Sequence, residues 1–310
     1  MSVAKLARVL DQGARDTCSR ILRDHRNDLE PHEETLTQNF VSGYVSRTRA
    51  AKLRSTTKEF TRWEEARHYG ADVALWFTNT RGEFAGVYLQ SKVLRRDGAY
   101  RGLDHTNSHG RQYDTLVSAG ARDGALAGYA FYNGLRGAEP DRSACGHGVG
   151  SPEINGISVA SALLLSAHIR SKVQRIEIEG MCSPLSCLVR LSGSSAYLAA
   201  GAGNPVNVSP SGTGNGGDSV RSTDPDLPRA LLGLATAWQQ DGARLHTSES
   251  VPPYVRALAE RAHNVAAYSE VNASDDYFEG QDHLQRLTEE SRFSEGIDES
   301  RYFTAVLVGP

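Results

Sequence analysis

A ten-residue run with an apolar start and a polar end, FAGVYLQSKV at residues 84–93, constrains the fold more than any other feature. Alternate side chains of an extended strand share a face, so Gln90 and Lys92 point to the same side, beside Tyr88. The residues on the other side suit a core: Ala85, Val87, Leu89, Ser91 and Val93. We therefore expect a strand that packs one face and aims an amide and an ammonium from the other.

A second strand is predicted just before it, at residues 72–78, and opens with Asp72. The two segments are joined through NTRGE, a turn signal that favours a hairpin. A hairpin brings Asp72 close to Gln90, so that a carboxylate, an amide oxygen and an ammonium converge. Hard oxygen ligands suit Mg²⁺ or Mn²⁺, and such an ion polarises a phosphate and lowers the pKa of a bound water. Lys92 is then expected to orient that water and to offset negative charge in the transition state.

The remaining pattern mixes helices and strands and favours an α/β core followed by a mainly helical C-terminal part. The N-terminal residues have the spacing of an amphipathic helix. The other expected elements are helices at 32–46 and 110–119, a strand at 126–132, a largely buried helix at 157–170, helices at 228–240 and 252–268, and a closing strand at 302–308.

The clearest change in composition falls at residues 201–228, which are crowded with Gly, Ser, Asn and Pro. Such a segment is typical of a loop or linker. We therefore expect an α/β core with its N-terminal helix at 1–200, the linker at 201–228, and a helical extension with a closing strand at 229–310.

Charge is unevenly distributed along the chain. From Arg47 to Arg111 there are 13 Lys and Arg against 7 Asp and Glu, a sum of +6, whereas the whole chain carries −3. A basic zone in a mildly acidic protein fits a phosphate-binding face; chance clustering on a solvated surface explains it equally well. Within this zone Arg95, Arg96 and Arg101 follow the strand directly and are candidates for holding backbone phosphates.

The order and spacing of these elements resemble the PD-(D/E)XK nuclease superfamily, in the Gln-x-Lys variant seen in Mrr-like restriction enzymes. In that superfamily a helix carrying a Glu precedes a strand ending in Asp, then a strand with the Glu/Gln-x-Lys element, then a helix and a further strand. The matching residues are Glu34 (or Glu33), Asp72 in GAD, Gln90-Ser91-Lys92 and Gln112 of the following helix. The resemblance covers roughly residues 30–135.

The resemblance implies a restriction endonuclease-like core, which is a central mixed sheet flanked by helices. It assigns catalysis to Asp72, Gln90, Lys92 and Glu34, and the metal to Asp72, Gln90 and Glu34, with Glu65 as the alternative acid. Gln112 joins the arginines as a contact to substrate. Two positions depart from the pattern: Asp72 has no Pro before it, and Gln90 replaces an acid, so the ion must depend on another carboxylate.

The implied activity is metal-dependent hydrolysis of phosphodiester bonds, in DNA rather than RNA, in bacterial restriction or anti-phage defence. Cutting both strands usually calls for two sites, so a homodimer is expected. The alternative is a catalytically inactive endonuclease-like module that binds nucleic acid or serves as a scaffold. The missing second acid in Gln90-Ser91-Lys92 favours that alternative.

Other classes of function are less well supported. No apolar run approaches the roughly 18 residues that a membrane span needs, and the N-terminus lacks a secretory signal. The four cysteines are too few and too scattered for a disulfide framework, which fits a reducing compartment. Together these features predict a cytoplasmic protein without a membrane partner. Cys145 and His147, with Cys182 and Cys187, leave a zinc or thiol site open. However, Cys182 and Cys187 are more widely spaced than a zinc knuckle, and no third residue is evident to orient a Cys–His pair.

Overall fold

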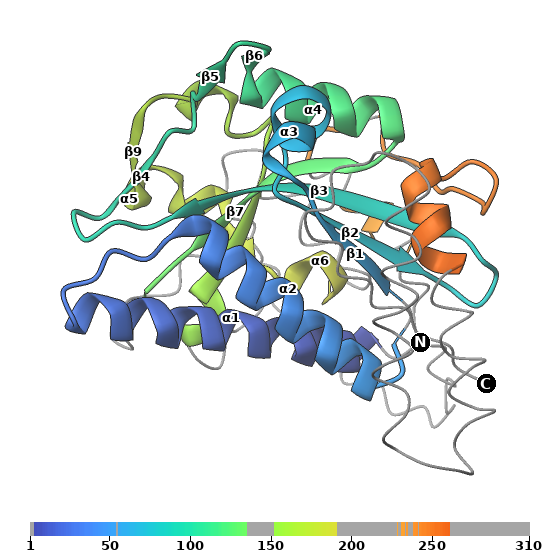
Figure 1. Ribbon diagram of the computed structural model, residues 1–310, viewed down its shortest axis with the longest axis horizontal. Helices are drawn as coiled ribbons and strands as arrows, with labels where there is room; N and C mark the ends of the chain where they lie inside the picture. The colour runs from blue at the N-terminus through green and yellow to red at the C-terminus, as the bar shows by residue number, and fades with distance from the viewer. Residues whose placement is uncertain are drawn as a thin grey trace, which may run out of the picture.

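A mixed sheet of six strands runs through the centre of the chain (Figure 1). The computed structural model describes residues 3–53, 55–134, 152–190, 228, 231–232, 234, 238–240 and 242–260. The strand order is β1-β2-β3-β7-β8-β10. Neighbours β3 and β7 are parallel, and the other neighbouring strands are antiparallel. The expected α/β class, with a central mixed sheet flanked by helices, is confirmed.

The elements of the sheet and its helices have the following bounds. The strands of the sheet are β1 (Ser55–Glu59), β2 (Val73–Thr78), β3 (Phe84–Val93), β7 (Leu126–Tyr132), β8 (Ile157–Ser161) and β10 (Ser183–Pro184). The helices are α1 (Val3–Arg26), α2 (Glu33–Ala50), α3 (Arg62–Glu64), the π-helix η1 (Glu65–Tyr69), α4 (Gln112–Asp123), α5 (Arg175–Ile178) and α6 (Cys187–Arg190). Two further antiparallel pairs lie outside this sheet: β4 (Ala99–Arg101) with β9 (Lys172–Gln174), and β5 (Thr106–Asn107) with β6 (Gly110–Arg111).

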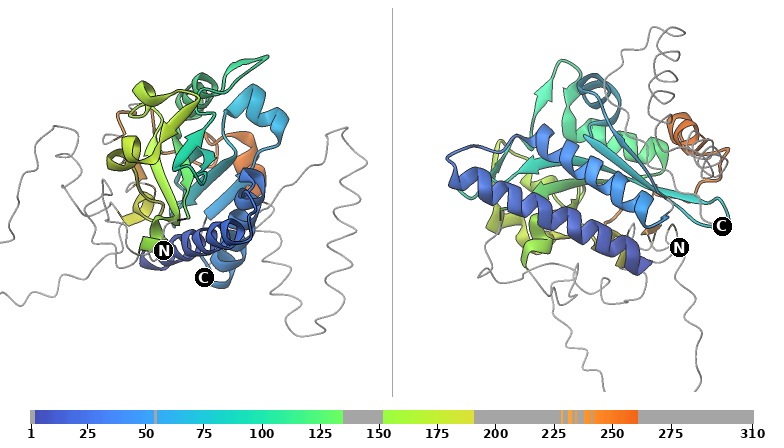
Figure 2. Two further views of the ribbon diagram at one scale, coloured as in Figure 1. Left: turned by 90° about the vertical axis from the view of Figure 1, so that its left-hand side faces the viewer. Right: turned by 60° about the horizontal axis from the view of Figure 1, so that its bottom comes forward.

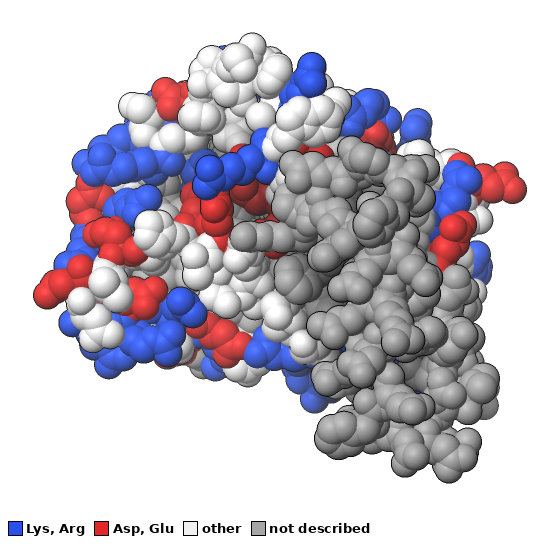
Figure 3. Space-filling model, viewed as in Figure 1, with Lys and Arg blue, Asp and Glu red and all other residues white. Residues whose placement is uncertain are grey.

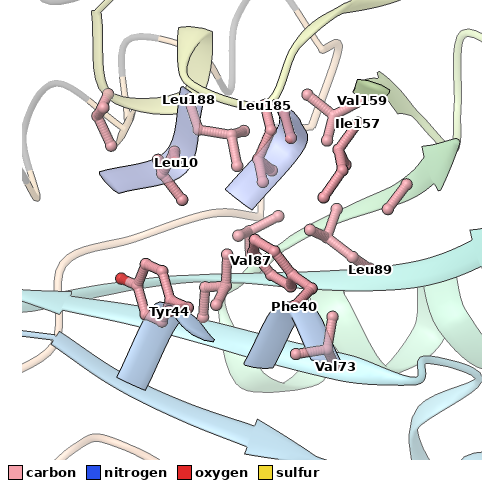
Figure 4. Close-up of a cluster of buried hydrophobic side chains, with 14 of the residues drawn as sticks. Leu10, Phe40, Tyr44, Val73, Val87, Leu89, Ile157, Val159, Leu185 and Leu188 are labelled. Atoms are coloured by element: carbon pink, nitrogen blue, oxygen red, sulfur yellow. The ribbon is translucent and has the colours of Figure 1, made fainter. Parts of the chain in front are cut away.

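Helices α1 and α2 lie side by side against one face of the sheet (Figures 1 and 2). Their buried side chains recur every three to four residues, which gives each helix an apolar stripe. Leu10 of α1 and Phe40 of α2 point toward Val87 and Leu89 of β3 in this core (Figure 4). The amphipathic N-terminal helix and the helix predicted at 32–46 are therefore confirmed, although α2 continues to Ala50.

The opposite face of the sheet packs against α4 and a set of aromatic side chains. Tyr88 and Tyr129 of the sheet and Leu116 of α4 belong to this second core. Because both faces are covered, β3 is buried along its whole length. The alternation predicted for β3 is confirmed, since Val87 and Leu89 lie in one core and Tyr88 in the other.

The helix predicted at 157–170 is wrong. Residues Ile157–Ser161 form β8, and a turn and a short 3₁₀ segment, Ser166–His168, follow. Both faces of β8 are buried, with Val159 in one core and Ala160 in the other. A strand covered on both sides reads as a continuous apolar run, and periodicity cannot separate such a run from a buried helix.

Part of the C-terminal region packs on the same sheet. His246 forms an isolated antiparallel bridge with Phe84, and Val251 and Val255 lie in the second core. Residues 253–260 are helical, in agreement with the helix expected at 252–268 as far as it is described. Of the linker expected at 201–228, only residue 228 is described, and it is helical; the strand expected at 302–308 lies outside the described residues. Among the residues described, no helix has the length and apolar character to cross a bilayer.

Candidate active site

Asp72 lies immediately before β2, opposite the end of β3. Its backbone N–H donates to Leu89 O at 3.0 Å and extends the β2–β3 pairing, in which Val73 pairs with Leu89. Its carboxylate oxygen Oδ2 accepts hydrogen bonds from the Ser91 backbone N–H at 2.6 Å and from Gln90 Nε2 at 2.8 Å. The hairpin thus places Asp72 and Gln90 in direct contact.

Gln90 is buried, with 1% of its surface exposed. Its Nε2 donates to Asp72 and lies 3.5 Å from Glu65 Oε1. Its other polar atom, Oε1, is buried and has no hydrogen-bond partner within the described part of the chain. A buried amide oxygen without a partner is costly, so Oε1 is well suited to bind a cation or a substrate donor.

Glu65 approaches the Asp72–Gln90 pair from η1, and its Oε1 lies 3.5 Å from Gln90 Nε2. It begins η1, directly after α3, where Thr61 and Glu64 form a capping box. Gln112, the first residue of α4, donates a short hydrogen bond to Glu65 Oε1. Gln112 was expected to contact substrate; in the structure it holds Glu65.

A close approach of two backbones fixes η1 against α4. The π-helix ends at Gly70, which has a left-handed φ of 60°. A Cβ built at Gly70 would come within 2.4 Å of the Leu116 backbone nitrogen. Only glycine fits this conformation at this distance, so Gly70 allows the segment carrying Glu65 to reach the site.

Lys92, the second polar residue of β3, reaches Glu33, the first residue of α2. Its ammonium lies 3.2 Å from Glu33 Oε1, and its side chain is 7% exposed. Glu34, which the sequence predicts as the site acid, instead bonds Arg62 at 2.6 Å and has a side chain 58% exposed. The acid of α2 that joins Lys92 is therefore Glu33.

Three carboxylates and one ammonium thus share a small volume at the end of β3. Burial raises the pKa of Asp72 well above its ordinary value, and the charges of Glu65 and Glu33 add to the effect. Burial likewise raises the pKa of Glu65, while Lys92 opposes the shift. The negative charge exceeds the positive charge in this cluster, which favours a cation.

A divalent ion fits these residues on two observations. The Gln90 oxygen is unpartnered, and the charge of three acids is opposed by Lys92. Among the described residues, however, no three His, Cys, Asp or Glu side chains form a complete ligand set. An ion here would therefore take ligands from the Gln90 amide, water or substrate as well as carboxylates, as Mg²⁺ commonly does.

A hydroxyl network lies behind the site, on the α2 side of β3. Ser91 Oγ donates to Tyr132 OH at 3.1 Å, and Thr37 Oγ1 lies 2.9 Å from the same phenol oxygen. Thr37 is one helical turn after Glu33, so the network fixes α2 to β3 where Glu33 meets Lys92. Buried Ser and Thr positions carry no sequence signal for such a role.

The arginines expected to hold phosphates make ion pairs with acids. Arg95 pairs with Glu30 at 3.4 Å, and Arg96 pairs with Asp28 at 3.0 Å. Both acids lie in the connection between α1 and α2. Arg101 pairs with Asp97 at 2.8 Å. To bind a phosphate, each of these arginines must break its ion pair with the neighbouring carboxylate.

A space-filling view shows how the charges are arranged on this side of the molecule (Figure 3). Acidic side chains gather in a hollow between the positions that α2 and α3 occupy in Figure 1, and basic side chains lie along its upper edge. Of the acids in the carboxylate cluster, Glu33 is partly exposed, with 30% of its side-chain surface accessible.

The cysteines do not form a second centre in the described residues. Burial raises the pKa of the Cys182 thiol to about 12, which disfavours the reactive thiolate. Cys187 is buried as well. Cys145 and His147 lie outside the described residues.

Comparison with known protein families adds one finding. Residues 6–292 match a family of unknown function, DUF6615. Since the match spans most of the chain, the protein belongs to this family. None of the curated proteins matches the chain.

Proposed function

We propose that this protein is a metal-dependent nuclease with a restriction endonuclease-like core, related to the PD-(D/E)XK superfamily. The observation that carries the proposal is the contact of Asp72 with Gln90 on adjacent strands, with Lys92 and Glu65 around it. An acid, an amide oxygen and a buried ammonium in one place are the groups that phosphodiester hydrolysis uses.

The order of elements supports the proposal. Helix α2 supplies Glu33, the start of β2 supplies Asp72, and β3 supplies Gln90 and Lys92. Helix α4 then leads to β7, which is parallel to β3. This order of elements matches that of the nuclease superfamily, except that Asp72 precedes its strand and does not end it.

Each residue has a distinct role in this proposal. Asp72, Gln90 and Glu65 would hold a divalent cation, Mg²⁺ or Mn²⁺, which supplies Lewis acidity toward the scissile phosphate and a more acidic water. The Lys92 ammonium offsets the negative charge that grows on the phosphate oxygens. Glu33 fixes the position of Lys92, and Gln112 fixes Glu65, through the contacts described above.

The proposed substrate is DNA, and the proposed setting is bacterial restriction or anti-phage defence. Both rest on the family resemblance, as does a homodimer, which would let two sites cut opposite strands. The match of the chain to a family of unknown function leaves these proposals open to experiment.

Cleavage assays test the proposal. The full-length protein is incubated with plasmid and with single-stranded DNA in Mg²⁺ or Mn²⁺, and the same is done with Asp72→Ala and Lys92→Ala. We expect metal-dependent cleavage by the wild type and a loss of at least about 100-fold in each variant. Lys172→Ala, a change at an exposed lysine of β9, is the matched control. Full cleavage by a folded Asp72→Ala or Lys92→Ala protein rules the proposal out.

A second candidate is an inactive module that keeps the endonuclease-like arrangement and binds nucleic acid or acts as a scaffold. One observation favours it: Asp72 Oδ2 already accepts two hydrogen bonds from the protein itself. An inactive module of this kind should bind no Mg²⁺ or Mn²⁺ at Asp72, so a metal titration separates the two candidates.

A further inference from the structure

Trp63 is an exposed aromatic residue directly beside the candidate active site. Its exposed fraction is 57%, whereas the chain's other two tryptophans, Trp76 and Trp238, are buried at 0% and 5%. It lies in α3, two residues before Glu65. A large exposed aromatic side chain often marks a binding surface.

The segment that carries Trp63 is fixed to β1 and α4 by contacts on its inner side. Thr61 and Glu64 cap its first turn, and Glu64 forms an ion pair with Lys58 of β1, whose side chain is only 4% exposed. At its other end Gly70 packs against the backbone of α4. The indole is therefore presented on a fixed support, which lowers the entropic cost of binding to it.

Charge is sorted between the two sides of α3–η1. Glu64 and Glu65 turn inward, toward Lys58 and Gln112. The outward side chains are Arg62, Trp63, Arg67 and His68, all exposed, and we call them the Trp63 face. The outward surface of this segment is thus aromatic and basic, although its sequence contains two acids.

The side chains of the Trp63 face are in contact with one another. The Arg67 guanidinium lies 5.3 Å from the centre of the Trp63 ring, and the His68 ring centre lies 4.8 Å from it. An aromatic surface with neighbouring cations is how proteins bind single-stranded nucleic acid, because bases stack on the ring while cations meet the phosphates.

Arg62 links the Trp63 face to the carboxylate cluster. Its guanidinium bonds Glu34 Oε1 at 2.6 Å, and the two side chains are 84% and 58% exposed. Glu34 is the neighbour of Glu33, which contacts Lys92. An ion pair this exposed contributes little to stability, so a phosphate group can replace the Glu34 carboxylate at small cost.

We infer that the Trp63 face binds single-stranded nucleic acid, with one base stacked on Trp63 and a neighbouring phosphate on Arg62 in place of Glu34. As a statement about the substrate of the nuclease site, this inference rests on the proposed function. It names a substrate class: strands with unpaired bases near the cleavage point, because in a duplex the base faces are covered by their neighbours.

The test measures binding separately from cleavage. Fluorescence anisotropy gives the Kd of short labelled oligothymidine, oligouridine and duplex DNA for the full-length protein carrying Lys92→Ala, which prevents turnover. Three further changes are compared in that background: Trp63→Ala, Arg62→Gln and Glu34→Gln. The Arg81→Gln and Glu83→Gln variants are the matched control, because Arg81 and Glu83 form another ion pair, at the β2–β3 turn, with side chains 56% and 24% exposed.

The three substitutions are expected to shift the Kd for single-stranded nucleic acid in different directions. Trp63→Ala weakens single-strand binding roughly 5- to 150-fold, the range for one stacked base. Arg62→Gln weakens it about threefold to tenfold and lowers the dependence of log Kd on log salt by about one. Glu34→Gln tightens binding, because it frees Arg62. The single strand also quenches the fluorescence of exposed Trp63, and this quenching disappears in Trp63→Ala.

Several results would overturn the inference. If Arg62→Gln and Glu34→Gln both weaken binding, the pair serves only to connect α2 and α3. Equal affinity for duplex and single-stranded DNA, or an unchanged Kd in Trp63→Ala, contradicts base stacking on Trp63. If the protein binds neither nucleic acid, the inference is wrong and the Trp63 face is a candidate for binding a protein. Cleavage by the protein with Lys92 intact is scored independently. Metal-dependent cleavage that Trp63→Ala leaves unchanged therefore removes this inference and keeps the nuclease.

Discussion

Asp72 and Gln90 meet across the pairing of β2 with β3, with 2.8 Å between Asp72 Oδ2 and Gln90 Nε2. The same carboxylate oxygen accepts the Ser91 backbone N–H. Strand register therefore brings the two proposed ligands together, and the backbone N–H of Ser91 fixes the Asp72 carboxylate. Among the described residues, the buried Oε1 of Gln90 has no hydrogen-bond partner and can accept a ligand.

Asp72→Asn is expected to stabilise the metal-free protein while abolishing cleavage. The change removes a buried negative charge but keeps an oxygen that accepts from Ser91. We expect the free energy of unfolding to rise by roughly 1–3 kcal/mol, measured by chemical denaturation with a chelator present. Asp97→Asn is the control, because its exposed carboxylate pairs with Lys172 and its pKa is lowered. A less stable Asp72→Asn protein would contradict the electrostatics described for the cluster.

The stability difference between wild type and Asp72→Asn should depend on pH. Because the pKa of Asp72 is raised in the folded state, the native protein binds more protons than the unfolded chain between the ordinary pKa, about 4, and the raised one. The cost of the charged Asp72 is therefore present above the raised pKa and is relieved as the pH falls from the raised value toward the ordinary one. Denaturation of both proteins across that range should show the difference shrinking toward acid pH. A stability difference that grows toward acid pH would contradict this prediction.

Glu33→Gln and Glu65→Gln are each expected to weaken metal-dependent cleavage by about 10- to 100-fold, with a higher metal concentration needed for half-maximal rate. Glu33 positions Lys92, and Glu65 contributes charge to the cation site. Glu249→Gln, at an exposed position in the turn that follows His246, is the matched control. The measurement is the cleavage rate as a function of Mn²⁺ concentration. Unchanged curves in both variants would show that neither acid belongs to the site.

Gly70→Ala is expected to be much more damaging than Gly82→Ala. Both glycines have a positive φ, 60° and 71°, so each change costs about 1–2 kcal/mol in backbone strain. At Gly82 a new Cβ meets nothing within 4 Å, whereas at Gly70 it meets the α4 backbone. We expect a further loss of roughly 1–3 kcal/mol at Gly70 and weaker metal binding, because Glu65 moves. Equal denaturation midpoints for the two variants would exclude this packing role.

The part of the site on β2 and β3 could be predicted because strand periodicity determines it. Alternation alone places Gln90 and Lys92 on one face, and a hairpin of fixed register brings Asp72 beside them. No such rule separates Glu33 from Glu34. Adjacent helical residues point about 100° apart, and the rotation of α2 is set by how Phe40 and its neighbours pack in the core.

Ion pairs between distant residues, and strands buried on both faces, could not be predicted from the sequence, because both depend on tertiary contacts. Arg95 and Arg96 read as free basic residues, yet the connection between α1 and α2 supplies their acids. The strand β1 was not predicted, because its polar residues STTKE lack an apolar alternation and are buried only through their neighbours. In β8 the apolar run fits a helix as well as a strand until the sheet around it is known.

Titration of the full-length protein with Mn²⁺ by isothermal calorimetry decides whether the cluster around Asp72 is a metal centre. At a pH below the raised pKa values of Asp72 and Glu65 we expect saturable binding to the wild type with release of protons, because a bound cation lowers those pKa values. Asp72→Asn should lose this binding while remaining folded. Identical binding by both proteins, or no binding by the wild type, would contradict the metal-dependent nuclease.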